Sequence, residues 1–499
     1  YRVRRRGHLL RQGGTNLALG ERFSSRWGLI LAGLGLAVGT GNLWRFPRIA
    51  AENGGAAFLI PWIIFLFIWS LPLMIAEFGI GRGARRGVVG SFATLIGPRF
   101  AWMGGFIAVT TTMIMFYYTV VTGWTLKYFV LTLTGGIQEV SPGGYWEIYS
   151  TSVWQPVFFH LVAVGIGAFI IQRGVVAGIE RANRILIPIL FVLLCVAVVR
   201  SVTLPGAERG LEFLFNPDLS ALKSYKTWLE ALTQSAWSTG AGWGMILTYA
   251  TYMRRKDDLV LNATTIGFGD NSASLLAGMA IVPTTFALLS NAEALEVMAS
   301  GNEGLTFIWI PQLFNQVPGG TILLPLFFLA LFCAALSSLI AMIEMATRIL
   351  MDAGINRRRA VRLVAIAICG IPSAVSMTVF ANQDWVWGVA LMISGLFVAI
   401  LATIYGQDKF RNKLVNVPGN DFNLGKGYSW ILKYLVPAEF TAMFGWWMYQ
   451  AATVDGWWDP TNALSVGTCL LQWGMALSVL IYFNKQIAAA SLRGEADEA

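Results

Sequence analysis

The sequence predicts an all-α integral membrane protein with about twelve transmembrane helices. Of its 499 residues, 56% are hydrophobic and only 13% are charged, and the mean hydropathy is +0.61. Such a composition lies outside that of soluble domains. Because a helix needs about 20 apolar residues to cross the hydrocarbon core, apolar runs of that length mark the spans. The predicted spans are 27–50, 56–80, 101–134, 153–171, 181–203, 228–253, 260–290, 321–351, 361–380, 384–406, 428–451 and 463–484.

The basic residues predict how these spans are oriented. Lys and Arg gather before the first span and in every second loop, whereas 135–152, 291–320 and 452–462 contain none. The loop at 204–227 is the exception, with charges of both signs. By the positive-inside rule, we expect a multi-pass protein of the plasma (inner) membrane with both termini in the cytoplasm. The net charge of +9 then reflects topology rather than nucleic-acid binding.

The remaining polar residues do not resemble those of an enzyme. The four cysteines lie singly in apolar spans, at no spacing that suits a disulfide or a metal site. The two histidines, His8 and His160, cannot form a catalytic cluster, and no set of nucleophile, base and orienting residue is evident. We therefore predict that the protein is not an enzyme.

Two of the spans are interrupted near their middles by glycines and small polar residues. They are the first, GLGLAVGTGN, and the sixth, QSAWSTGAGWG at 234–244. Counting from one to the other gives five spans, so the second unit enters the membrane from the opposite side, as in an inverted repeat of five plus five. The predicted parts of the chain are an N-terminal arm (1–26), a first repeat (27–203), a second repeat with an extracellular loop (204–406), spans 11 and 12 (407–484) and a cytoplasmic tail (485–499).

An interrupted helix offers ligands at membrane depth. Backbone groups freed by unwinding are too costly to leave facing lipid, so they must face protein or a hydrated cavity. A half-helix N-terminus presents N–H groups to an anion, and a C-terminal end presents carbonyl oxygens to a cation. One broken helix can therefore hold a carboxylate and a sodium ion together. The alternative is that the glycines only allow close helix packing, but their repetition in the sixth span disfavours it.

The motif GLILAGLGLAVGTGNLWRFPRIAAENGGAAFLIPW in the first span is highly specific. It is accompanied by IPWIIFLFIWSLPLMIAEFGIGR, the FYY of the third span, the whole sixth span, GDNSASLLAGMAIVP, LSS and YGQDKF. Over residues 21–410 the chain thus resembles the neurotransmitter:sodium symporter family. The resemblance implies the leucine-transporter fold, with spans 1 and 6 broken at the midplane, and sodium-coupled amino-acid transport.

The resemblance implies two sodium sites. The first would use the carbonyls of Gly35, Val38 and Ala334 and the hydroxyls of Ser337 and Ser338. Five oxygens suit a hard cation. A serine hydroxyl in a membrane helix can instead donate to a carbonyl of the preceding turn of the same helix. For each of the two serines taken alone, this alternative stays open.

The second sodium site would combine protein and substrate. Its implied ligands are the Ala37 carbonyl, the side chains of Asn42 and Ser238, a residue of the seventh span and the substrate carboxylate. The family usually has Asn in the seventh span. Here the best register puts Asp270 at that position, with Asn271 one residue away.

The Asp270 carboxylate affects whether transport requires chloride. Ser274, Gln234 and Ser238 match the chloride-using members of the family, whereas Trp62 stands where the chloride site has a tyrosine. Asp270 already supplies a fixed negative charge, and a chloride beside it would place two anions in one low-dielectric pocket. We therefore expect transport that does not require chloride.

Gly39 is the most informative substrate residue. Monoamine carriers of the family have Asp here, whereas glycine leaves room for a substrate that brings its own carboxylate. The resemblance implies that the Tyr118 hydroxyl and the backbone of Thr40 and Gly41 bind this carboxylate, and that Tyr118 and Trp237 form an aromatic lid. An amino acid fits such a site, and dopamine or serotonin does not.

The side-chain pocket predicts the size of the substrate. Trp243 takes a position that usually holds phenylalanine and should shrink the pocket, whereas Gly240 enlarges it. We therefore expect a small to medium neutral amino acid. The residues that the resemblance assigns to the pocket are Ile114, Trp237, Gly240, Trp243, Ser338 and Met342.

Charged residues within or beside the spans predict gates, because such charges are costly unless paired. Arg45 and Asp384 are expected to pair above the substrate. Glu77 is expected to bond the unwound backbone of the sixth span. The residues that match the inner gate are Arg22, Tyr252 and Asp352.

The sequence therefore predicts a sodium-coupled symporter that imports a neutral amino acid by alternating access. Two alternatives of the same fold stay open within transport: an amine or organic-acid substrate, and proton coupling in place of sodium. A channel is disfavoured by gates on both sides, and a non-transporting sensor is disfavoured by the intact sodium ligands.

Overall fold

The computed structural model describes residues 21–136, 141–370 and 372–494, and these residues form helices and connecting turns without any strand. The first half contains α1 (Arg26–Ala37), η1 (Gly41–Arg45), α2 (Phe46–Glu52), α3 (Ala56–Phe65), η2 (Leu66–Ser70), α4 (Leu71–Ala84), α5 (Val88–Ile96), η3 (Pro98–Phe100), α6 (Ala101–Leu133), α7 (Pro142–Thr151), α8 (Trp154–Gln172), η5 (Val175–Glu180), α9 (Arg181–Val202), α10 (Ala207–Phe215) and η6 (Leu219–Lys223).

The second half continues with the broken sixth span. Its elements are α11 (Tyr225–Ser238), α12 (Met245–Thr251), α13 (Leu259–Leu288), α14 (Asn291–Met298), α15 (Gly301–Glu303), η7 (Gly304–Trp309), α16 (Ile310–Gln316), α17 (Gly320–Asp352), α18 (Arg357–Cys369), η8 (Pro372–Ala374), α19 (Met377–Tyr405), α20 (Gln407–Phe410), η9 (Arg411–Val415), α21 (Lys426–Trp430), η10 (Ile431–Leu435), α22 (Val436–Ala452), α23 (Val466–Tyr482) and α24 (Asn484–Ser491).

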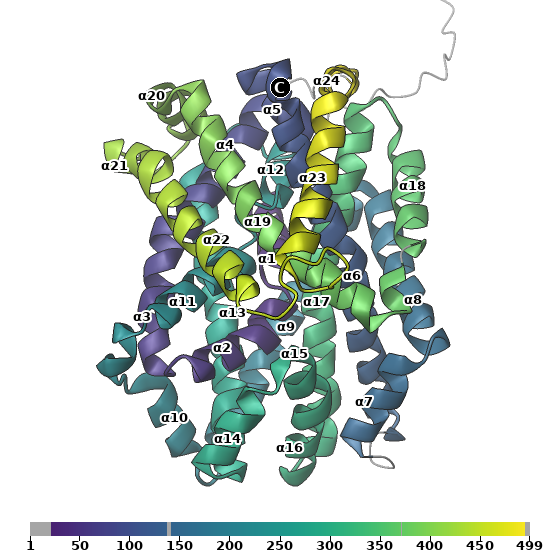
Figure 1. Ribbon diagram of the computed structural model, residues 1–499, viewed down its shortest axis with the longest axis vertical. Coiled ribbons are helices and arrows are strands. Elements are labelled where there is room, and N and C mark those ends of the chain that lie inside the picture. Colours follow the sequence, from purple (N-terminus) through teal and green to yellow (C-terminus); the bar gives the residue numbers. More distant parts are fainter. Residues whose placement is uncertain (1–20, 137–140, 371, 495–499) are drawn as a thin grey trace, which may run out of the picture.

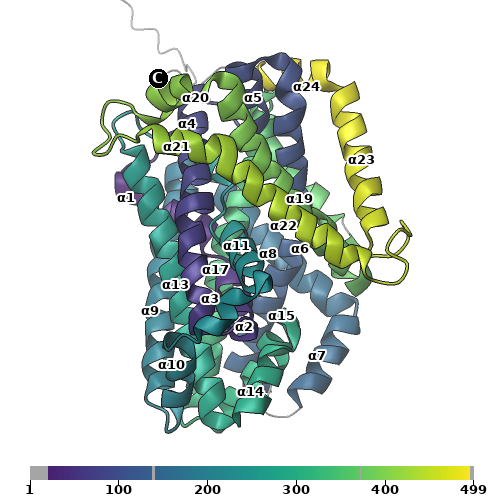
Figure 2. The ribbon, with the colours of Figure 1, turned by 60° about the vertical axis from the view of Figure 1, so that its left-hand side comes forward.

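The long helices run side by side along the length of the molecule. The short helices α7, α10, α14 and α16 gather at one end, called the α14 end below, and α5, α20 and α24 gather at the opposite end, called the α24 end (Figure 1). Turned by 60°, the molecule shows α23 at its edge, far from α9 (Figure 2). The helix α23, near the C-terminus, therefore stands outside the body formed by the two repeats.

The prediction of about twelve spans agrees with this arrangement. Within the described residues, seven helices are individually long and apolar enough to cross a membrane, and two bent pairs raise the number to nine. The other predicted spans correspond to the broken pair α11 and α12, to α18, and to the helical run from α21 to α22. The α17 span is 83% buried, whereas the span of η5 and α9 is only 22% buried. The former is therefore central, and the latter faces lipid.

The boundary between the predicted spans 361–380 and 384–406 is wrong. α18 ends at Cys369, and α19 already begins at Met377. Gly370 and Pro372 end the first helix. Glycine is unfavourable in the interior of a helix, and proline lacks a backbone N–H and disfavours the helical conformation of the residue before it. Ser376 then caps α19, since its side chain accepts a hydrogen bond from the Val379 amide.

The first span is broken as expected. α1 ends at Ala37, Val38 takes an extended conformation with ψ 95°, and the axis bends by 55° before the helix resumes. Within the break, the Gly39 amide donates to Asn42 Oδ1 at 2.8 Å. The side chain of Asn42 thus replaces a partner that the unwound backbone has lost.

The sixth span is broken in the same way between Ser238 and Met245. Gly240, Gly242 and Gly244 have φ values of +71°, +85° and +78°, a region that favours glycine. The predicted role of Glu77 is confirmed, because its carboxylate accepts from the Gly242 amide at 3.1 Å and from the Gly244 amide at 2.6 Å. A buried carboxylate therefore holds the break open.

Candidate functional site

A cavity of about 610 Å³ lies between the two breaks. It is lined by both broken spans and by α6, α17 and α19, and it reaches Asn302 of α15 and Leu464 of the connection between α22 and α23. The predicted site residues on its wall are Ala37, Gly39, Gly41, Asn42, Arg45, Tyr118, Trp237, Ser238, Gly240, Trp243, Ser338, Met342 and Asp384. Thr40 and Ile114 are buried beside it and do not line it.

The ligands of the first predicted sodium site converge at the end of α1. The Ser338 hydroxyl donates to the Gly35 carbonyl at 3.2 Å and lies 3.5 Å from the Val38 carbonyl. On the same helix as Ser338, the Ser337 hydroxyl donates to the Ala334 carbonyl at 3.0 Å. The Ser338 hydroxyl thus meets the carbonyl end of the α1 half-helix, which suits a hard cation, whereas the Ser337 hydroxyl bonds the preceding turn of its own helix.

The protein ligands of the second site also meet. Asn42 Nδ2 donates to Asp270 Oδ1 at 2.7 Å, and Asp270 is fully buried in α13. Asp270 and Ser238 lie next to each other, and neither Asp270 Oδ2 nor Ser238 Oγ has a hydrogen-bond partner within 3.5 Å among the described residues. Because an unpartnered buried oxygen is costly, these atoms fit a bound cation better than they fit the protein alone.

The neighbouring polar residues are already engaged. Ser274 Oγ accepts from Asn42 Nδ2 at 2.9 Å, and Gln234 Oε1 accepts from Arg45 at 2.5 Å. Trp62, at the position where the family's chloride site has tyrosine, is buried, and its Nε1 finds no partner within the described ranges. A carboxylate, Asp270, therefore shares this small polar region with the chloride-site counterparts.

The backbone at Gly39 packs closely against two hydroxyl groups. A β-carbon there would lie 2.8 Å from the Tyr118 hydroxyl and 3.0 Å from Ser338 Oγ, closer than van der Waals contact allows, whereas a β-carbon on Gly41 would meet nothing within 4 Å. The Tyr118 hydroxyl accepts from the Thr40 amide at 3.1 Å, so its own proton is left to donate. A hydroxyl donor thus lies beside two glycines on the cavity wall.

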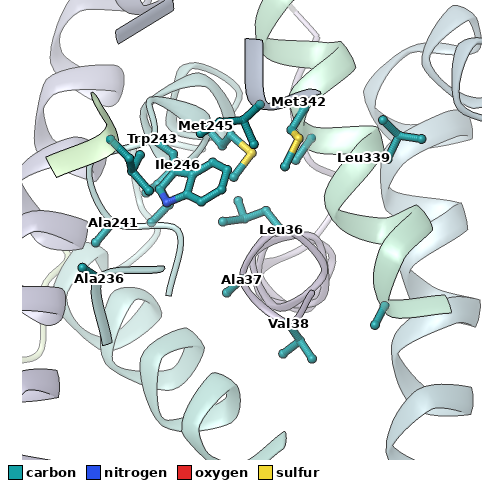
Figure 3. Close-up of a cluster of buried hydrophobic side chains, with 14 of the residues drawn as sticks. Leu36, Ala37, Val38, Ala236, Ala241, Trp243, Met245, Ile246, Leu339 and Met342 are labelled. Carbon is teal, nitrogen blue, oxygen red and sulfur yellow. The ribbon is translucent and has the colours of Figure 1, made fainter. Parts of the chain in front are cut away.

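The inner part of the cavity is lined by apolar side chains, among them methionines. Leu36 of the first break, Trp243 and Met245 of the second, and Met342 of α17 lie around one space (Figure 3). The rings of Trp237 and Trp243 meet edge to face at 5.9 Å between centroids. Sequence reasoning missed Leu36 and Met245, because an apolar residue in an apolar span carries no signal of its own.

The predicted outer pair is not formed. Arg45 Nη2 lies 3.4 Å from Glu230 Oε2, and Asp384 lines the same cavity without coming within 4.0 Å of Arg45 in the described structure. Glu230 and Gln234 are one turn apart on α11, so they hold the guanidinium together. The charge of Glu230 in an apolar region could have signalled this role.

The predicted inner gate is divided into two clusters. The Tyr252 hydroxyl donates to Glu344 Oε1 at 2.5 Å rather than to Asp352. Arg357 pairs with the fully buried Glu344 at 2.6 Å and also with Glu21. Glu344, Arg357 and Glu21 were not predicted, although a glutamate within the apolar α17 is a signal for function.

Asp352 belongs to the second cluster. Its carboxylate accepts from Arg348 Nε at 3.0 Å and from the Gly87 amide at 2.6 Å. The Arg348 guanidinium lies 5.4 Å from the centroid of the Tyr252 ring and thereby joins the two clusters. Arg22 directly precedes Phe23, whose amide donates to the Tyr252 carbonyl at 3.1 Å. The three predicted residues are therefore close in space through intermediaries.

Comparison with known proteins identifies the family of this chain. The model of the sodium:neurotransmitter symporter family matches residues 20–147 and 147–490. The chain belongs to this family. It is a sodium-dependent symporter rather than an enzyme, and the family and fold predicted from the first-span motif are confirmed.

Relatives cover nearly all of this symporter. An uncharacterized sodium-dependent transporter of Methanocaldococcus jannaschii is 31% identical over 94% of this chain and 98% of its own length. A sodium-dependent serotonin transporter of Drosophila melanogaster is 27% identical over 85% of this chain and 76% of its own length. Among solved structures, MhsT in complex with L-phenylalanine matches with a TM-score of 0.76 and 32% identity, covering 85% of this symporter and 99% of that chain.

Proposed function

We propose that this symporter imports a small to medium neutral amino acid together with two sodium ions, by alternating access. The observation that carries the proposal is the side of the cavity at Gly39 and Gly41, which has no side chain and lies beside the Tyr118 hydroxyl. A substrate carboxylate fits against this backbone and accepts from the Tyr118 hydroxyl. Its second oxygen reaches the ion that Asn42 and Asp270 hold.

The two sodium ions have different roles in this proposal. The ion between Asn42, Ser238 and Asp270 shares the substrate carboxylate, so sodium and substrate bind more tightly together than alone. The ion between α1 and Ser338 links the broken span to α17. Both ions therefore favour the state that carries substrate.

Chloride is not required in this proposal. Asp270 supplies a negative charge beside the sodium ion, and its Oδ2 has no other partner among the described residues. A chloride in the same buried pocket would repel that carboxylate. Undiminished uptake when gluconate replaces chloride supports this part, and loss of uptake overturns it.

The size of the side-chain pocket rests on Trp243 and Gly240. The indole reduces the volume, whereas Gly240, with φ +71°, adds no side chain to the wall. MhsT was solved with phenylalanine, so a pocket of this type accommodates an aromatic substrate in that protein. We expect glycine, alanine and other neutral side chains of up to medium size to bind here.

Sodium-dependent binding of the twenty radiolabelled amino acids to the purified protein tests the proposal. Binding of small neutral amino acids that vanishes without sodium supports it. Clear preference for tryptophan or leucine over glycine and alanine overturns the size assignment, and preference for a monoamine overturns the substrate class. Binding that is independent of sodium contradicts both ion sites, and binding without uptake into vesicles identifies a sensor.

Orientation is part of the proposal. The α24 end, with Arg357 and its neighbours, faces the cytoplasm, and the cavity opens to the outside at the α14 end. A membrane-impermeant maleimide should label Asp455→Cys, between α22 and α23, in intact cells, and should label Arg359→Cys only after permeabilisation. The reverse result contradicts this orientation.

A further inference from the structure

We propose that a groove between α8, η5 and α9 binds one anionic phospholipid. The groove has a volume of about 240 Å³ and shares no lining residue with the central cavity. Its apolar wall consists of Phe169, Ile170, Ala182, Ile185, Leu186 and Leu336. Two arginines, Arg173 and Arg181, also line it.

The groove opens toward lipid. The span of η5 and α9 is only 22% buried and that of α8 only 33% buried, so both stand at the edge of the bundle. Phe169 and Ile185 are 56% and 55% exposed on this edge. An apolar hollow in such a place suits an acyl chain, because its wall offers no hydrogen-bonding side chain apart from the two arginines.

The two arginines give the groove its preference for an anion. The Arg173 guanidinium lies 4.1 Å from the centroid of the Phe169 ring, which holds it over the apolar wall. Neither Arg173 nor Arg181 forms an ion pair or a side-chain hydrogen bond within the described part of the chain. Arg184, in contrast, pairs with Glu180 at 2.5 Å, so the acidic residue of this segment is already engaged.

A phospholipid satisfies both halves of the site. Guanidinium groups bind phosphate oxygens in a planar, two-pronged geometry, and the arginines are at the depth of the headgroups if the α24 end is cytoplasmic. Arg357, at that end, donates to the carbonyl of Ile171, two residues before Arg173. The bound lipid would then lie with its phosphate between Arg173 and Arg181 and one chain in the groove.

The groove lies behind the first sodium site. On the inner face of α9, the side chain of Asn183 packs so closely on Gly35 that a β-carbon there would come within 2.0 Å of it. On the other side, Leu336 directly precedes Ser337 and contributes to the wall of the groove. The lipid site therefore goes beyond the transport function and does not depend on which substrate is carried.

Native mass spectrometry of the full chain, titrated with phosphatidylglycerol or with phosphatidylcholine of the same acyl chains, tests the proposal. We expect one phosphatidylglycerol retained per chain with about tenfold preference over phosphatidylcholine. The double variant R173Q/R181Q should lose that preference. R358Q/R362Q is the matched control, because it removes two exposed arginines of α18 at the same end, and it should keep the preference.

Two further arms test the apolar half of the site. A182F fills the groove and should prevent retention although both arginines are present, and unchanged sodium-dependent substrate binding by this variant reports that it is folded. Glycerol 3-phosphate in excess should not displace the lipid. Equal retention of both lipids, equal loss in the control variant, full retention by A182F, or displacement by glycerol 3-phosphate would each overturn the proposal.

Discussion

Arg45 is held by Glu230, with 3.4 Å between Nη2 and Oε2, while Asp384 lines the same cavity unpaired with it. The ion pair draws the guanidinium toward α11 and away from the α19 side chain with which the resemblance pairs it. In the proposed transport cycle, closing the cavity above a substrate requires Arg45 to exchange Glu230 for Asp384. Glu230 would then stabilise the open arrangement.

The variant E230Q should favour the closed arrangement. A partly buried ion pair of this kind contributes up to about 1 kcal/mol, so we expect bound substrate to dissociate about fivefold more slowly in the presence of sodium. Dissociation of radiolabelled amino acid from the purified protein measures the change. E212Q, on the exposed α10, is the control. Faster or unchanged dissociation from E230Q would show that Glu230 does not compete with Asp384.

The variant G39A should weaken substrate binding without unfolding the protein. Its methyl group would lie 2.8 Å from the Tyr118 hydroxyl, beside the position assigned to the carboxylate. Overpacking of this kind costs about 1–3 kcal/mol, which corresponds to an affinity loss of about 5- to 150-fold. G165A is the matched control, because a β-carbon there meets nothing within 4 Å. Equal affinities of G39A and G165A would contradict the carboxylate assignment.

The variant S338A should raise the sodium concentration needed for half-maximal substrate binding by about tenfold, because it removes one of five oxygen ligands. Scintillation proximity binding across a sodium series measures this shift. S272A serves as the control, since Ser272 is exposed on α13 and donates only to the Phe268 carbonyl. A sodium dependence of S338A like that of the unaltered protein would exclude the hydroxyl as a ligand.

The variant D270N should make transport depend on chloride. Without the carboxylate, the pocket lacks the negative charge that balances the sodium ion, and an external anion can supply it. Uptake into vesicles in chloride and in gluconate should then differ severalfold for D270N and remain equal for the unaltered protein. N271A tests the register and should behave like the unaltered protein. Chloride dependence of N271A instead of D270N would assign the ligand to Asn271.

The sequence predicted the two helix breaks better than it predicted the contacts of the gate residues. Gly39, Asn42 and their neighbours act within a few residues of each other, so a local motif contains most of the geometry. The partners of Arg45 and Tyr252 come from helices far apart in the chain. No local pattern specifies whether Glu230 or Asp384 holds Arg45 at a given moment.

The variant R357Q should open the α24 end. It leaves Glu344, which is fully buried, without its guanidinium, and breaking such a pair costs about 3–5 kcal/mol. The Tyr252 hydroxyl then loses the fixed orientation of its acceptor, Glu344. Since the Phe23 amide is bonded to the Tyr252 carbonyl, the segment before α1 is then held less firmly. Hydrogen exchange of a peptide covering 21–30 should therefore become faster by a factor of ten or more, by an order-of-magnitude estimate. Peptides of α22 are the internal reference, and R359Q is the control variant, since Arg359 is exposed on the same helix. Equal acceleration in α22 would mean global destabilisation, and an unchanged rate at 21–30 would show that the Arg357 to Glu344 pair does not hold this end closed.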